Sequence, residues 1–99
     1  MRLDENTLKT IKKLAEQYFG KYCEVRIFGS RVDDTQKGGD IDIYIKTDLN
    51  VDILERKASF LAELKMTIGD QKIDLLVERN DNPEKSPIYE TARTTGIKI

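Results

Sequence analysis

The sequence has no histidine, no tryptophan and only one cysteine, Cys23. Without histidine a serine triad has no general base and most zinc sites lose a customary ligand, so serine-triad chemistry is excluded and a zinc centre is disfavoured. A lone cysteine cannot form an internal disulfide, which fits the reducing cytosol. We therefore expect Cys23 to be a small buried apolar side chain, since no histidine is available to activate it as a thiol.

An excess of charge of either sign is also missing, because 17 Lys and Arg residues stand against 18 Asp and Glu residues. The net charge of −1 gives no general attraction to nucleic acid, which argues against a polymerase-like template role. No apolar run approaches the roughly 20 residues that a membrane span needs, and no cleavable signal pattern opens the sequence. We expect a cytoplasmic protein with no membrane partner, folded as one domain over residues 1–99.

The most informative pattern is Gly29-Ser30 followed, after nine residues, by Asp40-Ile41-Asp42. Residues two apart on a strand point to the same face with Cα atoms roughly 6.5 to 7 Å apart, so Asp40 and Asp42 are spaced to share a cation. A third acid, Asp74, lies in the apolar run over residues 73–77, where an ionised carboxylate is costly unless it is paired or coordinates something.

Each of these pieces has an ordinary explanation when taken alone. Two acids on an alternating strand are usually its solvated face, Gly-Ser is a turn, and Lys37-Gly38-Gly39 lacks the spacing of a phosphate-binding loop. Together, however, a glycine turn after one strand, two acids on the next and one acid on a third converge on one point. Clustered acids of this kind predict a site for a divalent cation and a nucleotide.

Hydrophobic periodicity predicts three helices and three strands. The predicted helices run from an N-cap at Asp4 to Gly20, from an N-cap at Asn50 to Gly69, and from Ser86 and Pro87 through Arg93 to a stop at Gly96. The predicted strands cover residues 23–28, the segment with Asp40 and Asp42, and residues 72–78. We expect the second helix to pack these side chains on the sheet: Ile53, Leu54, Ala58, Leu61, Leu64 and Ile68.

The order Gly29-Ser30-Arg31, Asp40-Ile41-Asp42 and later Asp74 resembles the signature of the DNA polymerase beta-type nucleotidyltransferase superfamily. The whole short chain is similar to the minimal nucleotidyltransferases of that superfamily. The resemblance implies an α/β fold of the polymerase beta-like palm type, with a small mixed sheet flanked by helices. It also implies ATP or another nucleoside triphosphate as donor and two Mg²⁺ ions held by the three acids.

Carried over residue by residue, the resemblance makes Asp40, Asp42 and Asp74 the catalytic and metal-binding residues, with Asp74 serving the ion that activates the acceptor hydroxyl. Gly29 and Ser30 would bind the triphosphate. The sequence departs from the commonest pattern at Gly39, where a serine often stands, and at Val32-Asp33-Asp34, which replaces a more basic stretch.

Basic and aromatic residues near the motif are further candidates. Arg31 is the best placed to bind the triphosphate, followed by Arg26 and Lys46, and each is otherwise an ordinary surface charge. Tyr44 shares a strand face with Asp40 and Asp42, so it is equally a pocket residue or a core residue.

Minimal nucleotidyltransferases resembling this one are commonly paired with a helical HEPN-type protein as a toxin and antitoxin. The resemblance therefore implies transfer of a nucleoside monophosphate, AMP from ATP in the first instance, to a hydroxyl of a partner protein, most simply a tyrosine. Two alternatives remain at this point. One is a non-catalytic binding module that neutralises or scaffolds a partner by contact, and the other is nucleotidyl transfer to a small molecule in a cleft between subunits.

Overall fold

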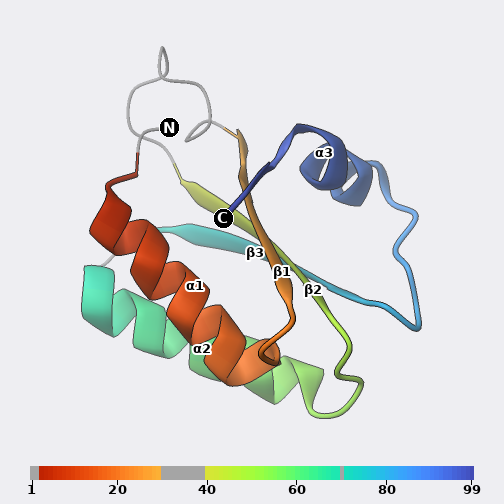
Figure 1. The fold of residues 1–99 in the computed structure, drawn as a ribbon, viewed down its shortest axis with the longest axis horizontal. Helices are drawn as coiled ribbons and strands as arrows, with labels where there is room; N and C mark the ends of the chain where they lie inside the picture. The colour runs from red at the N-terminus through yellow and green to blue at the C-terminus, as the bar shows by residue number, and fades with distance from the viewer. Residues whose placement is uncertain (1–2, 30–39, 70) are drawn as a thin grey trace.

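The computed structural model describes residues 3–29, 40–69 and 71–99. Across these ranges the chain forms three helices and four strands (Figure 1). The helices are α1 (Glu5–Phe19), α2 (Ile53–Ile68) and α3 (Pro87–Thr95), and the strands are β1 (Glu24–Phe28), β2 (Ile41–Thr47), β3 (Ile73–Arg79) and β4 (Ile97–Lys98).

The four strands form one mixed sheet in the order β3-β2-β1-β4. Strands β2 and β3 are parallel and are connected through α2, whereas β1 runs antiparallel to both β2 and β4. The expected α/β class with a small mixed sheet and flanking helices is confirmed. The two-residue strand β4 was not predicted, because two residues are too few for any periodic pattern.

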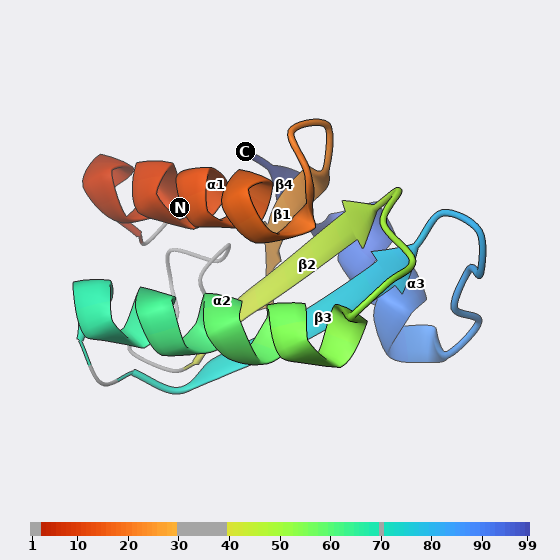
Figure 2. The ribbon, with the colours of Figure 1, turned by 90° about the horizontal axis from the view of Figure 1, so that it is seen from below.

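The helices cover the two faces of the sheet unequally. Figure 2 shows α1 and α2 side by side on one face and α3 on the other. Alternate residues of β2 point to opposite faces of the sheet. Ile41, Ile43 and Ile45 are fully buried toward α1 and α2. Asp42 and Tyr44 point to the face that carries α3. The first face therefore holds the main apolar core, and the acids lie on the second.

The first helix begins and ends as its sequence predicts. The backbone N–H of Thr7 donates to the Asp4 carboxylate at 2.7 Å, and Gly20 ends the helix with φ of 102°, a conformation that favours glycine. The apolar face of α1 packs against α2, where the rings of Phe19 and Phe60 meet edge to face with centroids 5.8 Å apart.

The prediction for the start of α2 is wrong. Asp52 is the residue before the helix, in a left-handed conformation with φ of 57° and no side-chain capping bond. Asn50 instead donates a hydrogen bond to the carboxylate of Asp81 at 3.3 Å, so its side chain connects two loops.

The predicted buried face of α2 is correct in part. Leu64 is fully buried and Ile53 packs against the core, but Leu54 is 78% exposed and Ala58 is exposed as well. Phe60, which was not on the predicted face, is fully buried. The helix carries apolar side chains around much of its circumference, and the side that carries Phe60 packs against Phe19.

Strand and helix ends otherwise shift by only one or two residues. β1 begins at Glu24, β3 covers Ile73–Arg79, and α3 continues to Thr95 before Gly96. Such differences are within the normal uncertainty of element ends. Cys23 is buried as expected, and burial raises the pKa of its thiol.

Candidate functional site

Two of the predicted site residues, Asp42 and Asp74, are direct neighbours. They occupy paired positions in the parallel ladder of β2 and β3, so their side chains leave the sheet on the same face. Asp42 is half-buried and Asp74 is exposed, and their carboxyl groups share a hydrogen bond. The register between the strands thus brings together two acids that are 32 positions apart in the sequence.

Gly29 lies against the same carboxyl group. It follows Phe28, the residue of β1 that pairs with Asp42, and it has φ of 76°, where side chains other than hydrogen are strained. A Cβ atom at this position would lie 3.0 Å from the Cγ of Asp42 and would overlap one of its carboxylate oxygens. A bare backbone at the end of β1 is therefore required for Asp42 to keep its position.

Asp40 precedes β2 and pairs with a residue that the sequence did not suggest. The Nζ atom of Lys72 lies 3.5 Å from an oxygen of Asp40. Lys72 precedes β3, and its carbonyl accepts a hydrogen bond from the backbone N–H of Ile41 at 3.1 Å, which continues the pairing of the two strands toward the acids. The sequence alone does not show this proximity, because it depends on the register of β2 and β3. The only hint in the sequence is that Lys72 stands two residues before Asp74 and so shares its strand face. We call Asp40, Asp42 and Asp74 the carboxylate cluster.

Burial and the neighbouring acids change the pKa of Asp42. Burial, followed by the hydrogen bond and charge of Asp74 and then the charge of Asp40, raises the pKa of Asp42 to about 6, while the charge of Lys72 acts in the opposite direction. At neutral pH most of the Asp42 carboxyl groups are therefore ionised, at a cost in free energy that a nearby cation would relieve.

The donor chemistry of the cluster suits a hard cation, although the cluster does not form a complete site. Carboxylate oxygens are the ligands that Mg²⁺ prefers, usually supplemented by water and by substrate phosphates. Over the described ranges, no group of three His, Cys, Asp or Glu side chains is arranged to hold a metal ion. Asp42 and Asp74 face one another, while Asp40 contacts Lys72. A bound ion would therefore need ligands from water or substrate as well as from these acids.

The remaining predicted residues have different positions. Ser30 and Arg31 lie outside the described residues, as does the Lys37-Gly38-Gly39 segment. Arg26 contacts the carboxylate of Glu24 at 2.6 Å and the carbonyl of Gly96 at 3.0 Å, so its guanidinium links β1 to the end of α3.

A second polar group lies on the same face of the sheet, beneath α3. Tyr44 is fully buried and donates a hydrogen bond to Glu78, which is only 2% exposed. Arg93 of α3 donates to both Glu78 oxygens at 2.9 and 2.8 Å, and the backbone N–H of Glu84 donates at 2.7 Å. Of the two alternatives for Tyr44, the structure supports the core residue.

These contacts determine the protonation of the group. Burial opposes ionisation of Glu78, but the hydrogen bonds from Tyr44, from the Glu84 amide and from Arg93 outweigh it and lower the pKa of Glu78. Burial and the bond to Glu78 raise the pKa of Tyr44. The group is a hydrogen-bonded ion pair that attaches α3 to the sheet.

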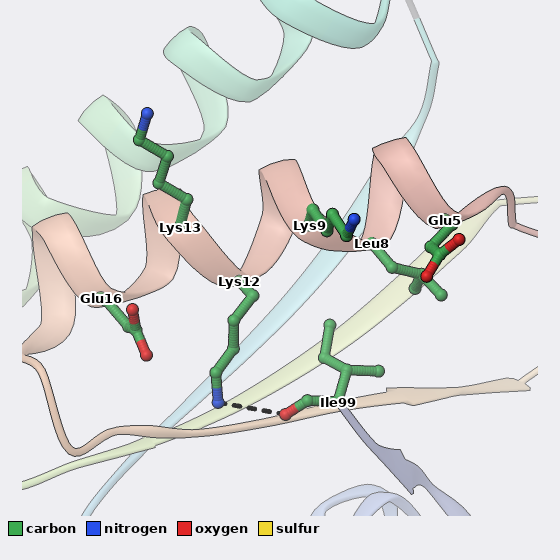
Figure 3. Close-up of a pocket in the computed structure, with 7 residues that line it drawn as sticks. All are labelled: Glu5, Leu8, Lys9, Lys12, Lys13, Glu16 and Ile99. Atoms are coloured by element: carbon green, nitrogen blue, oxygen red, sulfur yellow. Dashed lines mark hydrogen bonds between the residues drawn. The ribbon is translucent and has the colours of Figure 1, made fainter.

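A groove of about 320 Å³ lies elsewhere, between α1 and the last residue (Figure 3). Leu8 and Ile99 contribute apolar surface, and Lys12 points across the groove to donate to the Ile99 carbonyl at 3.0 Å. None of the residues that line it belongs to β2 or β3. Its size fits a small ligand, but the crowded acids and the close backbone approach are at the carboxylate cluster, which we therefore take as the candidate site.

The comparisons with known proteins add no constraint on this site. No model of a known protein family matches the sequence, and no curated protein matches it either. No helix within the described part of the chain is long and apolar enough to cross a membrane.

Proposed function

We propose that this protein is a Mg²⁺-dependent nucleotidyltransferase with a polymerase beta-like palm fold. The observation that carries the proposal is the contact of the bare backbone at Gly29 with the carboxyl group of Asp42, which in turn faces Asp74. Position 29 cannot carry a side chain, and it lies beside crowded carboxylates at one end of the sheet. This arrangement suits a metal-bound triphosphate.

The transferred group is a nucleoside monophosphate, AMP from ATP in the first instance. The acceptor hydroxyl oxygen attacks the α-phosphorus of the nucleotide, a new P–O bond forms, and the bond to the β-phosphate oxygen breaks so that pyrophosphate leaves. When bound, Mg²⁺ would neutralise charge on the phosphates and lower the pKa of the attacking hydroxyl.

The residues of this chain have distinct roles in that reaction. Asp40 and Asp42 would supply carboxylate oxygens to the bound cations. By the family resemblance, Gly29 and Ser30 would bind the triphosphate and Arg31 would add positive charge. Asp74 is the most exposed of the paired acids, so it faces the incoming acceptor and accepts the hydroxyl proton.

The proposed acceptor is a hydroxyl, most simply a tyrosine, on a helical HEPN-type partner, for which this protein would act as antitoxin. The family resemblance supports this part of the proposal. Asp74 is exposed, which is compatible with an acceptor carried by another molecule.

The experiment is to recover the tagged protein with its partner from the native host and to incubate the pair with Mg²⁺ and each nucleoside triphosphate in turn. Intact-mass measurement should show the partner gaining the mass of one nucleoside monophosphate. The same incubation with an Asp42→Asn variant, or with EDTA, should leave the partner mass unchanged. Stable binding without any mass gain by the partner would count against the enzyme.

That outcome would favour a non-catalytic binding module, which one observation supports specifically. Four apolar side chains, spaced four residues apart on α2, form an exposed stripe: Leu54, Ala58, Ala62 and Met66. Leu54 and Met66 are 78% and 86% exposed, and such a stripe on the outer face of a helix is typical of a contact surface. Substitution of both by glutamine should release the partner if contact alone accounts for the function.

A further inference from the structure

The outer face of α2 carries large apolar side chains that the described residues leave open to water. Leu54 in the first turn and Met66 in the last turn are the most exposed of them. Ala58 and Ala62 lie between these two and are exposed as well. At about 100° per residue, positions two before and two after Phe60 point roughly 160° away from that buried ring. The stripe is therefore centred opposite the core.

The stripe has the same spacing when it is followed from either end of α2. Leu54 stands six residues before position 60, and Met66 stands six after it. Ala58 stands two before that position, and Ala62 stands two after it. A two-fold axis through the centre of this face would thus place Leu54 of each copy against Met66 of the other, with the alanines between them. Side chains as small as alanine at the crossing allow two helices to approach closely.

Two exposed charges beside the stripe follow the same symmetry. Glu55 stands five residues before position 60 and Lys65 stands five after it, and both are exposed. Neither forms an ion pair with another residue in the described ranges. In an antiparallel pair of α2 helices, Glu55 of each copy faces Lys65 of the other, whereas a parallel pair would bring like charges together. The charges are thus complementary to those of a second, antiparallel copy.

We propose that the stripe binds a second copy of this chain, with the two α2 helices packed antiparallel about a two-fold axis. A partner of another sequence would not require the stripe and its charges to be symmetric about one position. The inference goes beyond the proposed function and does not depend on it, because the carboxylate cluster lies outside α2. One helix face is smaller than the roughly 800 Å² per partner of a standard interface, so the dimer is weak, with a dissociation constant on the order of 10 to 100 μM.

The first test is analytical ultracentrifugation of the purified chain, at concentrations from well below to well above the expected dissociation constant. The wild-type chain should change from monomer to dimer over this range. Leu54→Gln combined with Met66→Gln should raise the dissociation constant at least about tenfold. Because both side chains are exposed, the melting temperature of the dilute protein should not fall.

Ile88→Gln is the matched control. Ile88 is also a large apolar side chain and is 53% exposed, but it belongs to α3 on the opposite face of the sheet (Figure 2). Its replacement should change the dissociation constant by less than about twofold. A dimer that persists unchanged in the combined variant of Leu54 and Met66, or one that Ile88→Gln weakens equally, overturns the proposal.

Charge reversal tests the pairing of the two copies. Glu55→Lys should raise the dissociation constant at least about threefold, because it places two positive charges together at both ends of the contact. Lys65→Glu should do the same with negative charges. The two changes combined exchange the partners and should restore the wild-type constant to within about twofold. A combined variant as weak as either single one overturns the antiparallel pairing.

Disulfide cross-linking tests the orientation directly. Positions 54 and 66 are about 18 Å apart along a helix, so in an antiparallel pair each lies near the other position of the second copy and far from its own equivalent. Mild oxidation of a mixture of Leu54→Cys and Met66→Cys should therefore give a covalent dimer, while either variant alone should not. Cross-linking of each variant alone, but not of the mixture, indicates a parallel pair and overturns the proposal.

A wild-type chain that stays monomeric over the whole concentration range also overturns the proposal. If such a chain is recovered with a host protein that Leu54→Gln and Met66→Gln together release, the stripe belongs to that protein and the second copy is rejected. Neither result bears on nucleotidyl transfer, which is tested separately by Asp42→Asn and the mass of the partner.

Discussion

Replacing Asp42 with asparagine should stabilise the metal-free protein while abolishing its response to Mg²⁺. The folded protein raises the pKa of Asp42 from 3.8 to about 6, chiefly through burial and Asp74. Each pKa unit corresponds to about 1.4 kcal/mol, so the full shift sets an upper limit of roughly 3 kcal/mol on the cost of ionising Asp42 in the fold. Asp42 is only half-buried, and solvent screening reduces the expected gain to about 1 to 1.5 kcal/mol.

The sign of the effect follows from proton linkage. Below pH 3.8 Asp42 is protonated in both the folded and the unfolded protein, so its ionisation costs nothing. Between that value and about pH 6 the unfolded chain loses its proton first, so the wild-type protein becomes less stable as pH rises. Asparagine does not ionise, and its advantage should be absent at the acidic end of this window and complete at neutral pH.

The assay is urea unfolding in EDTA at pH 4, 5 and 7, with a thermal melt at each pH. In a chain of this size a gain of about 1 kcal/mol corresponds to roughly 4 to 8 °C in melting temperature. Glu55→Gln, an exposed acid on α2 away from the cluster, is the control and should change stability by at most about 0.5 kcal/mol. Loss of stability in Asp42→Asn, or an equal gain at pH 4 and pH 7, would refute the crowding argument.

Three further predictions follow from the same contacts. Gly29→Ala should cost about 1 to 2 kcal/mol of stability in urea unfolding because of the positive φ. In titration calorimetry it should weaken Mg²⁺–ATP binding at least about tenfold, because the new Cβ atom displaces Asp42. Unchanged nucleotide affinity in the folded variant would move the phosphate site elsewhere. Asp74→Asn should keep nucleotide affinity within roughly tenfold but slow single-turnover transfer by at least about a hundredfold, and a near wild-type rate would make Asp74 a structural acid. Tyr44→Phe should cost about 1 to 2 kcal/mol in urea unfolding because buried Glu78 loses a donor, with Mg²⁺–ATP affinity unchanged; a large loss of Mg²⁺–ATP binding would show that the two polar groups are coupled.

The parts of the fold that the sequence predicted are those with local signals. Asp4 and Gly20 mark the ends of α1 because capping depends on a side chain and a backbone conformation within the same turn. The start of α2 has no such signal, since Asp52 caps with no side-chain bond, while the more suitable Asn50 contacts Asp81, 31 positions away. Long-range contacts of this kind are not encoded in local spacing.

The site was predictable to a similar extent. Alternation along the strands predicted that Asp42 and Asp74 face away from the apolar core, and the structure pairs them. Lys72 was missed because its contact with Asp40 depends on the register of two strands separated by α2. Glu78 was read only as the end of a strand, since its partners Tyr44 and Arg93 come from two other elements.

The close approach of Gly29 to Asp42 has a consequence for how this sequence can vary. A Cβ atom at position 29 would occupy the space of the Asp42 carboxylate, so an acidic side chain fits at position 42 only when position 29 has no side chain. In a library that randomises both positions, folded variants with alanine at 29 should be enriched in small residues at 42, and such variants would have given up the acid. Stability selection alone would accept that exchange, whereas selection for the proposed nucleotidyl transfer should recover glycine and aspartate together.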